Sequence, residues 1–320
     1  MMNLQHLKYT IEVYKAGSIS GAAQNLYMAQ PNLSKAIKEL EKELGFEIFE
    51  RSPEGMRPTD MGIRFIYHAK NILAEVDDVK RMTESEDGRV FNYKISIPRG
   101  TYLAMAYSAF FNEIERDCGI NAVVSETNAQ QTIGNVINRG YDLGIVRVLK
   151  ETADTYFKYF DVNELEYKTV LDFSMVIAMS RSHPLAKKKV LLNEDLAGYT
   201  KITHGDFRYP NAKNEDRFEN PEPFKGADRV IYTYERGSQF ELLDGLKDSY
   251  MWVSPIPGRY LEMYDLVQKK CSVKNNHYVD VAIRKKRNPL SKYDRLFMEK
   301  IEEERDKIIK IIKDMDEAVG

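Results

Sequence analysis

The sequence predicts an α+β fold with more than one domain. At 320 residues, the chain exceeds the length at which one hydrophobic core usually suffices. Apolar residues recur at helical spacing before residue 60, one helical stripe continues from residue 60 to about residue 86, and strand-like runs alternate with helical runs after residue 92. These three patterns predict a helical N-terminal domain, a long connecting helix and a C-terminal α/β region with a mostly parallel sheet.

The composition argues against a membrane protein. The chain is 43% hydrophobic and 30% charged, and no run of about 18 apolar residues occurs in it. Its start leads directly into an amphipathic helix without the apolar core of a signal peptide, so we expect a cytoplasmic protein with no membrane partner. Cys118 and Cys271 lie far apart, and we expect two separate thiols, with a redox switch as the alternative.

Residues 17–40 predict two short helices joined by a tight turn. Ser18 can cap the first helix, and Pro31 fits the first turn of the second, where a missing N–H costs nothing. The buried positions recur every three or four residues: Ile19, Ala22, Ala23 and Leu26 in the first helix, then Leu33, Ile37, Leu40 and Leu44 in the second. A supporting helix precedes them, with the stripe Leu4, Leu7, Ile11 and Tyr14. The second helix is polar near its N-terminus, the end that a helix-turn-helix protein presents to DNA.

The next segment predicts a wing. Phe46, Ile48 and Phe49 form a short apolar run, which a loop rich in Pro, Gly and Arg follows up to residue 58. A new helix then starts at Thr59 or Asp60. Three helices and a wing make a winged helix-turn-helix, and a helical bundle that binds another protein is the alternative.

These residues resemble the LysR family of bacterial transcription regulators. The positions that match in order and spacing are Ala22, Ala23, Leu26, Gln30, Pro31, Leu33, Ser34, Ile37, Leu40, Glu41, Leu44, Gly45, Phe49, Arg51, Thr59 and Gly62. The resemblance implies a homodimer or homotetramer that binds double-stranded promoter DNA. The residues it implies at the DNA are Gln30, Pro31, Asn32, Ser34, Lys35 and Lys38 of the second helix, Arg51, Arg57 and Pro58 of the wing, and Ser18. The wing departs from the family in carrying Pro53, Glu54, Gly55 and Met56, where members often have more basic residues.

Net charge does not supply the DNA affinity. Residues 1–60 contain seven Lys and Arg against eight Asp and Glu, which gives 7 − 8 = −1, and the whole chain has a net charge of −2. We therefore expect DNA contact to depend on a local basic patch, with the acidic residues of the domain turned away or paired.

Residues 61–91 predict a linker helix and a hinge after the DNA-binding domain of residues 1–60. The apolar stripe of this helix is Ile63, Ile66, Ala69, Leu73, Val76 and Val79. Such a stripe can pack against its own domain or against a second copy. The resemblance implies the second arrangement, an antiparallel pair of linker helices. The polar stretch of residues 85–92, which contains Gly88, predicts the hinge.

Residues 92–320 predict an effector-binding domain. Residues 141–146 and the His-Pro-Leu-Ala turn at residues 183–186 also resemble the LysR family. The resemblance implies two α/β lobes like those of periplasmic binding proteins, with lobe I at about residues 92–165 and 266–320 and lobe II at about 166–265. A long polar stretch at residues 207–227 departs from the family pattern.

Ligands of open α/β sheets bind beyond the carboxyl ends of the strands. This rule and the resemblance together select Arg99, Thr101, Tyr102, Arg147, Thr203 and His204 as candidate effector-binding residues. The arginines would favour an anionic effector through charge-assisted hydrogen bonds. The alternatives are surface ion pairs for the arginines and an ordinary loop position for His204.

The sequence therefore predicts a DNA-binding transcriptional regulator that responds to a small-molecule effector. A phosphate-binding glycine motif, a nucleophile elbow and paired histidine ligands are not found, so we expect no enzyme activity, no cofactor and no metal. The alternative is a solute-binding or enzymatic α/β protein whose winged helix does not bind DNA.

Overall fold

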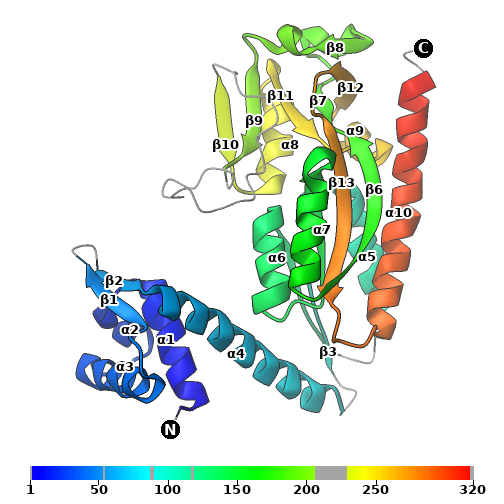
Figure 1. Cartoon of the computed structure of the whole chain (residues 1–320). Coiled ribbons are helices and arrows are strands. Elements are labelled where there is room, and N and C mark those ends of the chain that lie inside the picture. Colours follow the sequence, from blue (N-terminus) through cyan, green and yellow to red (C-terminus); the bar gives the residue numbers. More distant parts are fainter. Residues whose placement is uncertain (1, 53–54, 87–89, 117–118, 206–228, 318–320) are drawn as a thin grey trace. The chain divides into compact units, whose positions relative to one another are not determined.

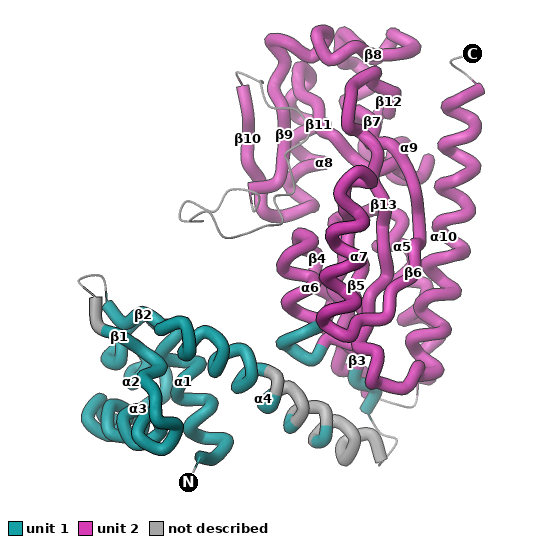
Figure 2. The backbone as a smooth tube through the Cα atoms, in the orientation of Figure 1, with its two compact units in different colours: residues 1–92, 137–140 teal, residues 93–136, 141–320 magenta. Residues whose placement is uncertain are grey.

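The computed structural model describes residues 2–52, 55–86, 90–116, 119–205 and 229–317, and the structural statements below concern these residues. They form two compact units, residues 1–92 with 137–140 and residues 93–136 with 141–320 (Figure 2). Several predicted features lie outside the described residues: the wing tip at Pro53 and Glu54, the hinge at Gly88, Cys118 and the polar stretch 207–227. In the described part, no helix has the length and apolar character that a membrane crossing requires.

The first unit is a winged helix-turn-helix followed by a long helix, as predicted (Figure 1). Its elements are α1 (Leu4–Ala16), α2 (Ile19–Asn25), α3 (Gln30–Leu44), β1 (Phe49–Ser52), β2 (Gly55–Pro58) and α4 (Asp60–Glu86). The predicted caps are present. The Ser18 hydroxyl accepts a hydrogen bond from the Gly21 N–H at 3.1 Å, and the Thr59 hydroxyl accepts one from the Gly62 N–H at 2.9 Å. Gly45 ends α3 at a φ of 77°, a conformation that favours glycine.

The stripe of α4 is divided between two environments. Ile66 packs in the core of the winged helix, and Ala69 packs with Leu7 and Ile11 of α1. Ile63, Ile72 and Val79 are exposed. The first turns of α4 therefore belong to the hydrophobic core of their own unit, and a substitution at Ile66 would disturb that core before it disturbed any pairing of chains.

Two close backbone contacts fix the wing on the helices. The Met56 N–H donates to the Gly17 carbonyl at 2.8 Å, which joins β2 to the turn between α1 and α2. A Cβ atom at Gly62 would lie 1.9 Å from the Ile48 carbonyl oxygen. Only glycine allows α4 to start this close to Ile48, the residue before β1.

The second unit contains two mixed sheets (Figure 1). The five-stranded sheet has the order β4-β3-β5-β13-β6, with β3 (Val90–Ile97), β4 (Gly119–Glu126), β5 (Leu143–Leu149), β6 (Leu165–Ser174) and β13 (His277–Lys285). The six-stranded sheet has the order β10-β9-β11-β7-β12-β8, with β7 (Val176–Ser180), β8 (Val190–Leu192), β9 (Thr200–His204), β10 (Val230–Thr233), β11 (Ser249–Val253) and β12 (Leu266–Ser272). We call the parts built on these sheets lobe I and lobe II. The expected mostly parallel sheet is wrong in detail, because β13 runs antiparallel to β5 and β6, and β7 runs antiparallel to β11 and β12.

The sheets place the lobe boundaries at different residues from those predicted. β6 lies in lobe I and β12 lies in lobe II, so the chain crosses between the lobes at Met175 and again between Ser272 and His277. The Asn276 side chain marks the first crossing. Its Oδ1 accepts from the Met175 N–H at 3.1 Å, and its Nδ2 donates to the Met175 carbonyl at 2.9 Å. Residues 165–180 resemble one continuous strand in sequence because this break depends on a side chain about 100 residues away.

Helices cover both sheets. Lobe I carries α5 (Thr101–Asn112), α6 (Ala129–Asn138), α7 (Ala153–Val162) and α10 (Lys292–Glu317), and lobe II carries α8 (Arg236–Gly245) and α9 (Gly258–Met263). α10 packs on α5 through Phe297 and Phe110, whose ring centres are 5.2 Å apart. Lobe II also contains a 3-10 turn, Asn193–Leu196.

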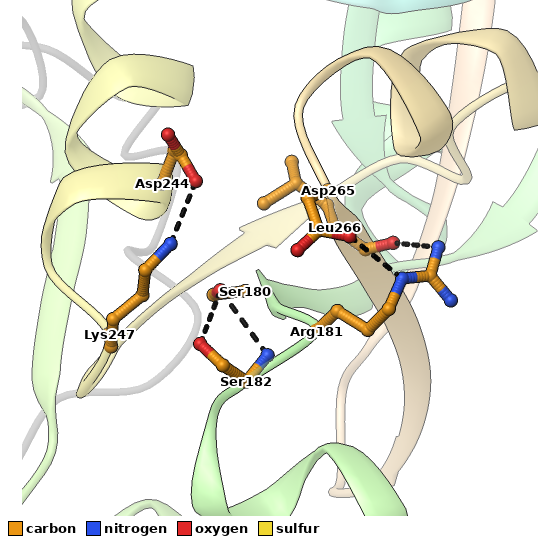
Figure 3. A network of polar contacts seen from close by, with 7 residues as sticks. All are labelled: Ser180, Arg181, Ser182, Asp244, Lys247, Asp265 and Leu266. Carbon is orange, nitrogen blue, oxygen red and sulfur yellow. Dashed lines mark hydrogen bonds and ion pairs between the residues drawn. The ribbon is translucent and has the colours of Figure 1, made fainter.

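A group of polar contacts lies in lobe II near Ser180, the last residue of β7 (Figure 3). Arg181 Nε donates to Asp265 Oδ1 at 3.0 Å, and Lys247 Nζ donates to Asp244 Oδ1 at 2.8 Å. These side chains are about half exposed, so each pair contributes little stability.

His183, three residues after the end of β7, is buried, and its Nδ1 accepts a hydrogen bond from the Leu185 N–H at 3.0 Å. The His-Pro-Leu-Ala motif thus caps a turn through an unprotonated histidine nitrogen.

Candidate DNA-binding surface and effector pocket

α3 separates an apolar face from a polar face. Leu33, Ile37 and Leu40 are buried against α1, α2 and the wing. The opposite side exposes Gln30, Pro31, Asn32, Lys35 and Lys38, with Ser34 half-buried. Ala29, the residue before the helix, supplies no side-chain cap; Pro31 has no N–H, and the Asn32 N–H donates to the Ala29 carbonyl at 3.0 Å. This surface offers hydrogen-bond donors, amide groups and two lysines at one end of a helix.

The acidic residues of this unit are used in different ways. Glu41 Oε1 accepts from the Ile48 N–H at 2.8 Å and from the Phe49 N–H at 3.1 Å, which ties α3 to the start of the wing. The hydrogen bond from the Met2 N–H lowers the pKa of Glu43. Glu39 stays on the exposed face, 3.9 Å from Lys35 in a largely solvated pair. The positive charge of α3 is therefore local and only partly offset.

The remaining predicted DNA contacts take three positions. Arg57 is exposed on β2, opposite Glu50 of β1, and Pro58 next to it is half-buried. Arg51 lies in β1, and its side chain is outside the described residues. Ser18 uses its hydroxyl to cap α2. Tyr27, in the turn between α2 and α3, is 98% exposed.

The second candidate site is a cavity of about 130 Å³ lined by residues of both lobes. Five of the six predicted residues line it: Arg99, Thr101, Arg147, Thr203 and His204. Thr101 is the first residue of α5, and Ala129 and Arg236, the first residues of α6 and α8, also line the cavity. Three helix N-termini therefore meet at this cavity, and their dipoles favour a negative charge there.

Tyr102 does not belong to the pocket, and its prediction is wrong. It follows Thr101 on α5, and one step along a helix turns the side chain by about 100° into the core. Tyr102 is fully buried, and its hydroxyl donates to Asp280 Oδ2 at 2.6 Å. Burial and the Asp280 carboxylate raise the pKa of Tyr102 well above its ordinary value.

Arg147 lines the pocket with a charge that the protein itself neutralises. Its Nε and Nη2 atoms donate to the two carboxylate oxygens of Asp280, each at 2.7 Å. Asp280 is completely buried, and the ring of Phe173 lies 4.9 Å from the guanidinium carbon. Such a bidentate pair holds the guanidinium in one orientation. Arg147 therefore forms a rigid part of the pocket wall, and Asp280 already neutralises its charge.

Two buried hydroxyl groups in the pocket have no partner among the described residues. They are Oγ1 of Thr101 and the phenol oxygen of Tyr278, whose residues are 4% and 2% exposed. Burial raises the pKa of Tyr278, so its phenol stays protonated and can donate. An unsatisfied buried polar group costs about 1–3 kcal/mol. A bound polar molecule would remove this cost.

Side chains that line the pocket from lobe II interact with one another and with lobe I. Gln239 Nε2 lies 2.7 Å from Nδ1 of His204. Arg236 Nη1 lies 2.8 Å from Glu126 Oε1 of β4, so this ion pair joins the lobes at the pocket. The sequence did not identify several lining residues that come from separate strands and helices: Thr127, Asn128, Lys201, Arg236, Gln239, Trp252, Ser254 and Tyr278. Among the described residues of the lining, four side chains are cationic and none is acidic, but Asp280 and Glu126 offset the charges of Arg147 and Arg236.

Comparison with known proteins agrees with both parts of the chain. A family model described as "Bacterial regulatory helix-turn-helix protein, lysR family" matches residues 4–63. The regulator MetR of Haemophilus influenzae is 26% identical over 206 residues, 63% of each chain. The uncharacterized regulator YcgK of Bacillus subtilis is 39% identical over 105 residues, 32% of each chain. The match to MetR thus spans less than two thirds of that relative's length.

Solved structures extend the likeness to the whole fold. The crystal structure of CbnR, described as a LysR family transcriptional regulator, aligns with a TM-score of 0.57 and 16% identity over 95% of this chain and 99% of that one. A full-length variant of OxyR from Pseudomonas aeruginosa aligns with a TM-score of 0.52 and 16% identity over 94% and 98% of the two chains. Residues 4–63 thus match the helix-turn-helix domain of the LysR family, and the chain as a whole shares the fold of these solved regulators.

Proposed function

We propose that this protein is a sequence-specific DNA-binding transcriptional regulator whose promoter binding changes when a small-molecule effector enters the interlobe pocket. The observation that carries the proposal is the exposed polar N-terminal face of α3, next to the wing, in a domain that matches the family model. The chain then acts by binding DNA in the cytoplasm, and it has no catalytic role. Residues 1–60 bind DNA, residues 61–91 pair two copies, and the remainder binds the effector.

DNA recognition follows from the side chains of α3 and the wing. Gln30, Asn32 and Ser34 carry groups that pair with base edges in the major groove. Lys35, Lys38 and Arg57 are exposed cations that suit phosphates. Arg51 and Pro58 extend the same role along the wing, and Ser18 holds α2 in place beside it. An operator with two related half-sites fits a paired protein.

The exposed apolar side of α4 is the proposed pairing surface. Met61, Ile72 and Val79 are exposed and lie within about 20° of one another around the helix axis. We expect Ile72→Glu with Val79→Glu to convert dimers or tetramers into monomers in analytical ultracentrifugation, with helix content unchanged by circular dichroism. Ile66→Glu is the contrasting variant, because it introduces a charge into the domain core and should unfold the first unit. Parent protein that sediments as a monomer would contradict the pairing.

We propose a small organic anion as the effector. The lining contains Arg99, Lys201 and Arg236 besides Arg147, and the hydroxyls of Thr101 and Tyr278 need partners. Thr203 and His204 line the pocket from lobe II, so a bound ligand would contact both lobes. Regulation requires that the ligand binds one arrangement of the lobes more tightly than the other, because equal affinity shifts no equilibrium.

Trp252 supplies a direct assay, since it lines the pocket and the chain contains one tryptophan. We expect a subset of small organic acids to change its fluorescence in a saturable way. Thr101→Val, which removes one hydroxyl at constant shape, should weaken that binding about tenfold. Tyr293→Phe, remote from the pocket lining, is the matched control. A panel of acids that leaves the fluorescence unchanged would count against an anionic effector.

DNA binding is tested without knowledge of the operator. Purified protein is incubated with a randomised duplex library, and bound duplexes are sequenced through several rounds of selection. We expect enrichment of a motif with two related half-sites. A library that stays random would contradict sequence-specific binding, whatever the effector assay shows.

A further inference from the structure

Tyr27 adopts a backbone conformation that tyrosine disfavours. It lies in the turn between α2 and α3, with a φ of 52°. Its N–H donates to the Gln24 carbonyl at 3.1 Å, and the next N–H, of Met28, donates to the Ala23 carbonyl at 3.0 Å. This is a left-handed helix end, where glycine or asparagine is favoured because a larger side chain crowds the backbone. The turn geometry alone would therefore select a smaller residue.

The side chain of Tyr27 gains almost nothing from packing. The residue is 98% exposed, whereas tyrosine normally buries its ring and leaves only the hydroxyl in water. An exposed ring forgoes the hydrophobic stabilisation that aromatic residues usually provide. Tyr27 thus combines an unfavourable backbone conformation with an unpacked ring. Folding of this unit does not explain the choice of tyrosine.

The position of Tyr27 suggests a use outside the fold. It precedes Gln30, the first residue of α3, by three residues. Its exposed neighbours in the sequence are four amide residues and two small apolar residues: Gln24, Asn25, Gln30 and Asn32, then Ala29 and Pro31. One aromatic ring beside an alanine and a proline is smaller than the apolar patch that a protein partner needs. A phenol hydroxyl is, in contrast, a common donor to DNA phosphates.

We propose that Tyr27 contacts the backbone of double-stranded DNA, with its hydroxyl donating to a phosphate beside the bases that α3 reads. This inference rests on the proposed function. The contact fixes the position of the N-terminus of α3 on the duplex, and phosphate contacts of this kind set register. It adds affinity on every sequence, because the phosphate is common to all of them.

The test compares Tyr27→Gly and Tyr27→Phe with the full-length wild-type chain. The probes are a duplex that the wild type selects from a randomised library and an unrelated duplex of equal length. Tyr27→Gly should melt at the same temperature as the wild type or higher, since glycine relaxes the turn. Its affinity for both duplexes should nevertheless fall about tenfold or more, as expected for loss of a hydrogen bond to a charged group.

Tyr27→Phe separates the hydroxyl from the ring. We expect it to lose most of the affinity that Tyr27→Gly loses, with an unchanged dependence of affinity on salt, because a neutral donor releases no counterion. Tyr234→Phe, another exposed tyrosine but in the second unit, is the control and should bind as the wild type does.

Each outcome bears on a stated claim. Wild-type affinity of Tyr27→Gly on both duplexes would overturn the inference and leave the proposed function intact. Wild-type affinity of Tyr27→Phe would overturn the phosphate hydrogen bond. Failure of the wild type to enrich any duplex would overturn the proposed function and this inference together.

Discussion

The lysines on the exposed face of α3 lie in solvent, whereas Arg147 at the interlobe pocket is buried and paired with Asp280. Lys35 and Glu39 are both largely exposed at 3.9 Å, but Arg147 and Asp280 are almost fully buried and joined by two bonds of 2.7 Å. Exposed charges interact weakly and are screened by salt. Buried charges fix geometry and are costly to separate. The exposed face of α3 therefore suits reversible binding of a large polyanion. The interlobe pocket suits a small ligand, because the guanidinium of Arg147 is already held in place.

The strongest test of this contrast is Asp280→Asn. It leaves the Arg147 guanidinium without its buried counter-charge and weakens the bond from Tyr102. We expect the free energy of unfolding of the second unit to fall by about 3–5 kcal/mol, measured by urea denaturation with Trp252 fluorescence. Asp265→Asn breaks the exposed pair with Arg181 and should cost less than about 1 kcal/mol. Equal losses for the two variants would contradict the contrast.

Gly62→Ala tests how tightly the DNA-binding unit is packed beneath its exposed surface. The new Cβ would lie 1.9 Å from the Ile48 carbonyl oxygen, so the start of α4 must move. We expect a loss of about 1–3 kcal/mol in the thermal or urea unfolding of the first unit. Gly134→Ala is the control, because a Cβ there meets nothing within 4 Å and alanine favours the helix α6. Unchanged stability of Gly62→Ala would contradict the close contact at Gly62.

Lys35→Ala probes the exposed surface itself. Removing one phosphate contact should weaken binding to all duplexes and reduce the slope of log affinity against log salt by about 1. The melting temperature should stay the same, because the pair with Glu39 is solvated. Lys247→Ala in the second unit is a control with a similar exposed pair. An unchanged salt slope would remove Lys35 from the DNA contact.

The same contrast explains which features the sequence could predict. The caps Ser18 and Gly45 and the stripe of α3 act within a few residues of their partners, so local spacing revealed them. The pocket depends on strands that meet only in the folded lobes. Tyr278 of β13 and Lys201 of β9 carry no local signal that separates them from other strand residues. Tyr102 is the exception, because helical rotation from Thr101 already directed it into the core.

The lobe boundaries failed for a related reason. Residues 165–180 contain neither glycine nor proline, and nothing local marks the crossing at Met175. The Asn276 amide satisfies both backbone groups of Met175 in place of a neighbouring strand. Long-range hydrogen bonds of this kind decide where a strand leaves one sheet, and they appear only in three dimensions.

The smallest expected effect concerns His183, whose buried ring should make the free energy of unfolding depend on pH. Burial lowers the pKa of His183, because the charged form loses its hydration. The folded chain then prefers the neutral ring. The contribution of the neutral His183 ring to the stability of the fold is complete above the unfolded-state pKa of about 6.5. This contribution is lost as the pH falls toward the lower folded-state pKa. We expect His183→Asn, which keeps an acceptor for the Leu185 N–H, to reduce the loss of unfolding free energy between about pH 7 and pH 5 by up to about 1 kcal/mol. His68→Asn on an exposed turn of α4 should leave that pH dependence unchanged, and an equal reduction in both variants would show that burial of His183 is not its cause.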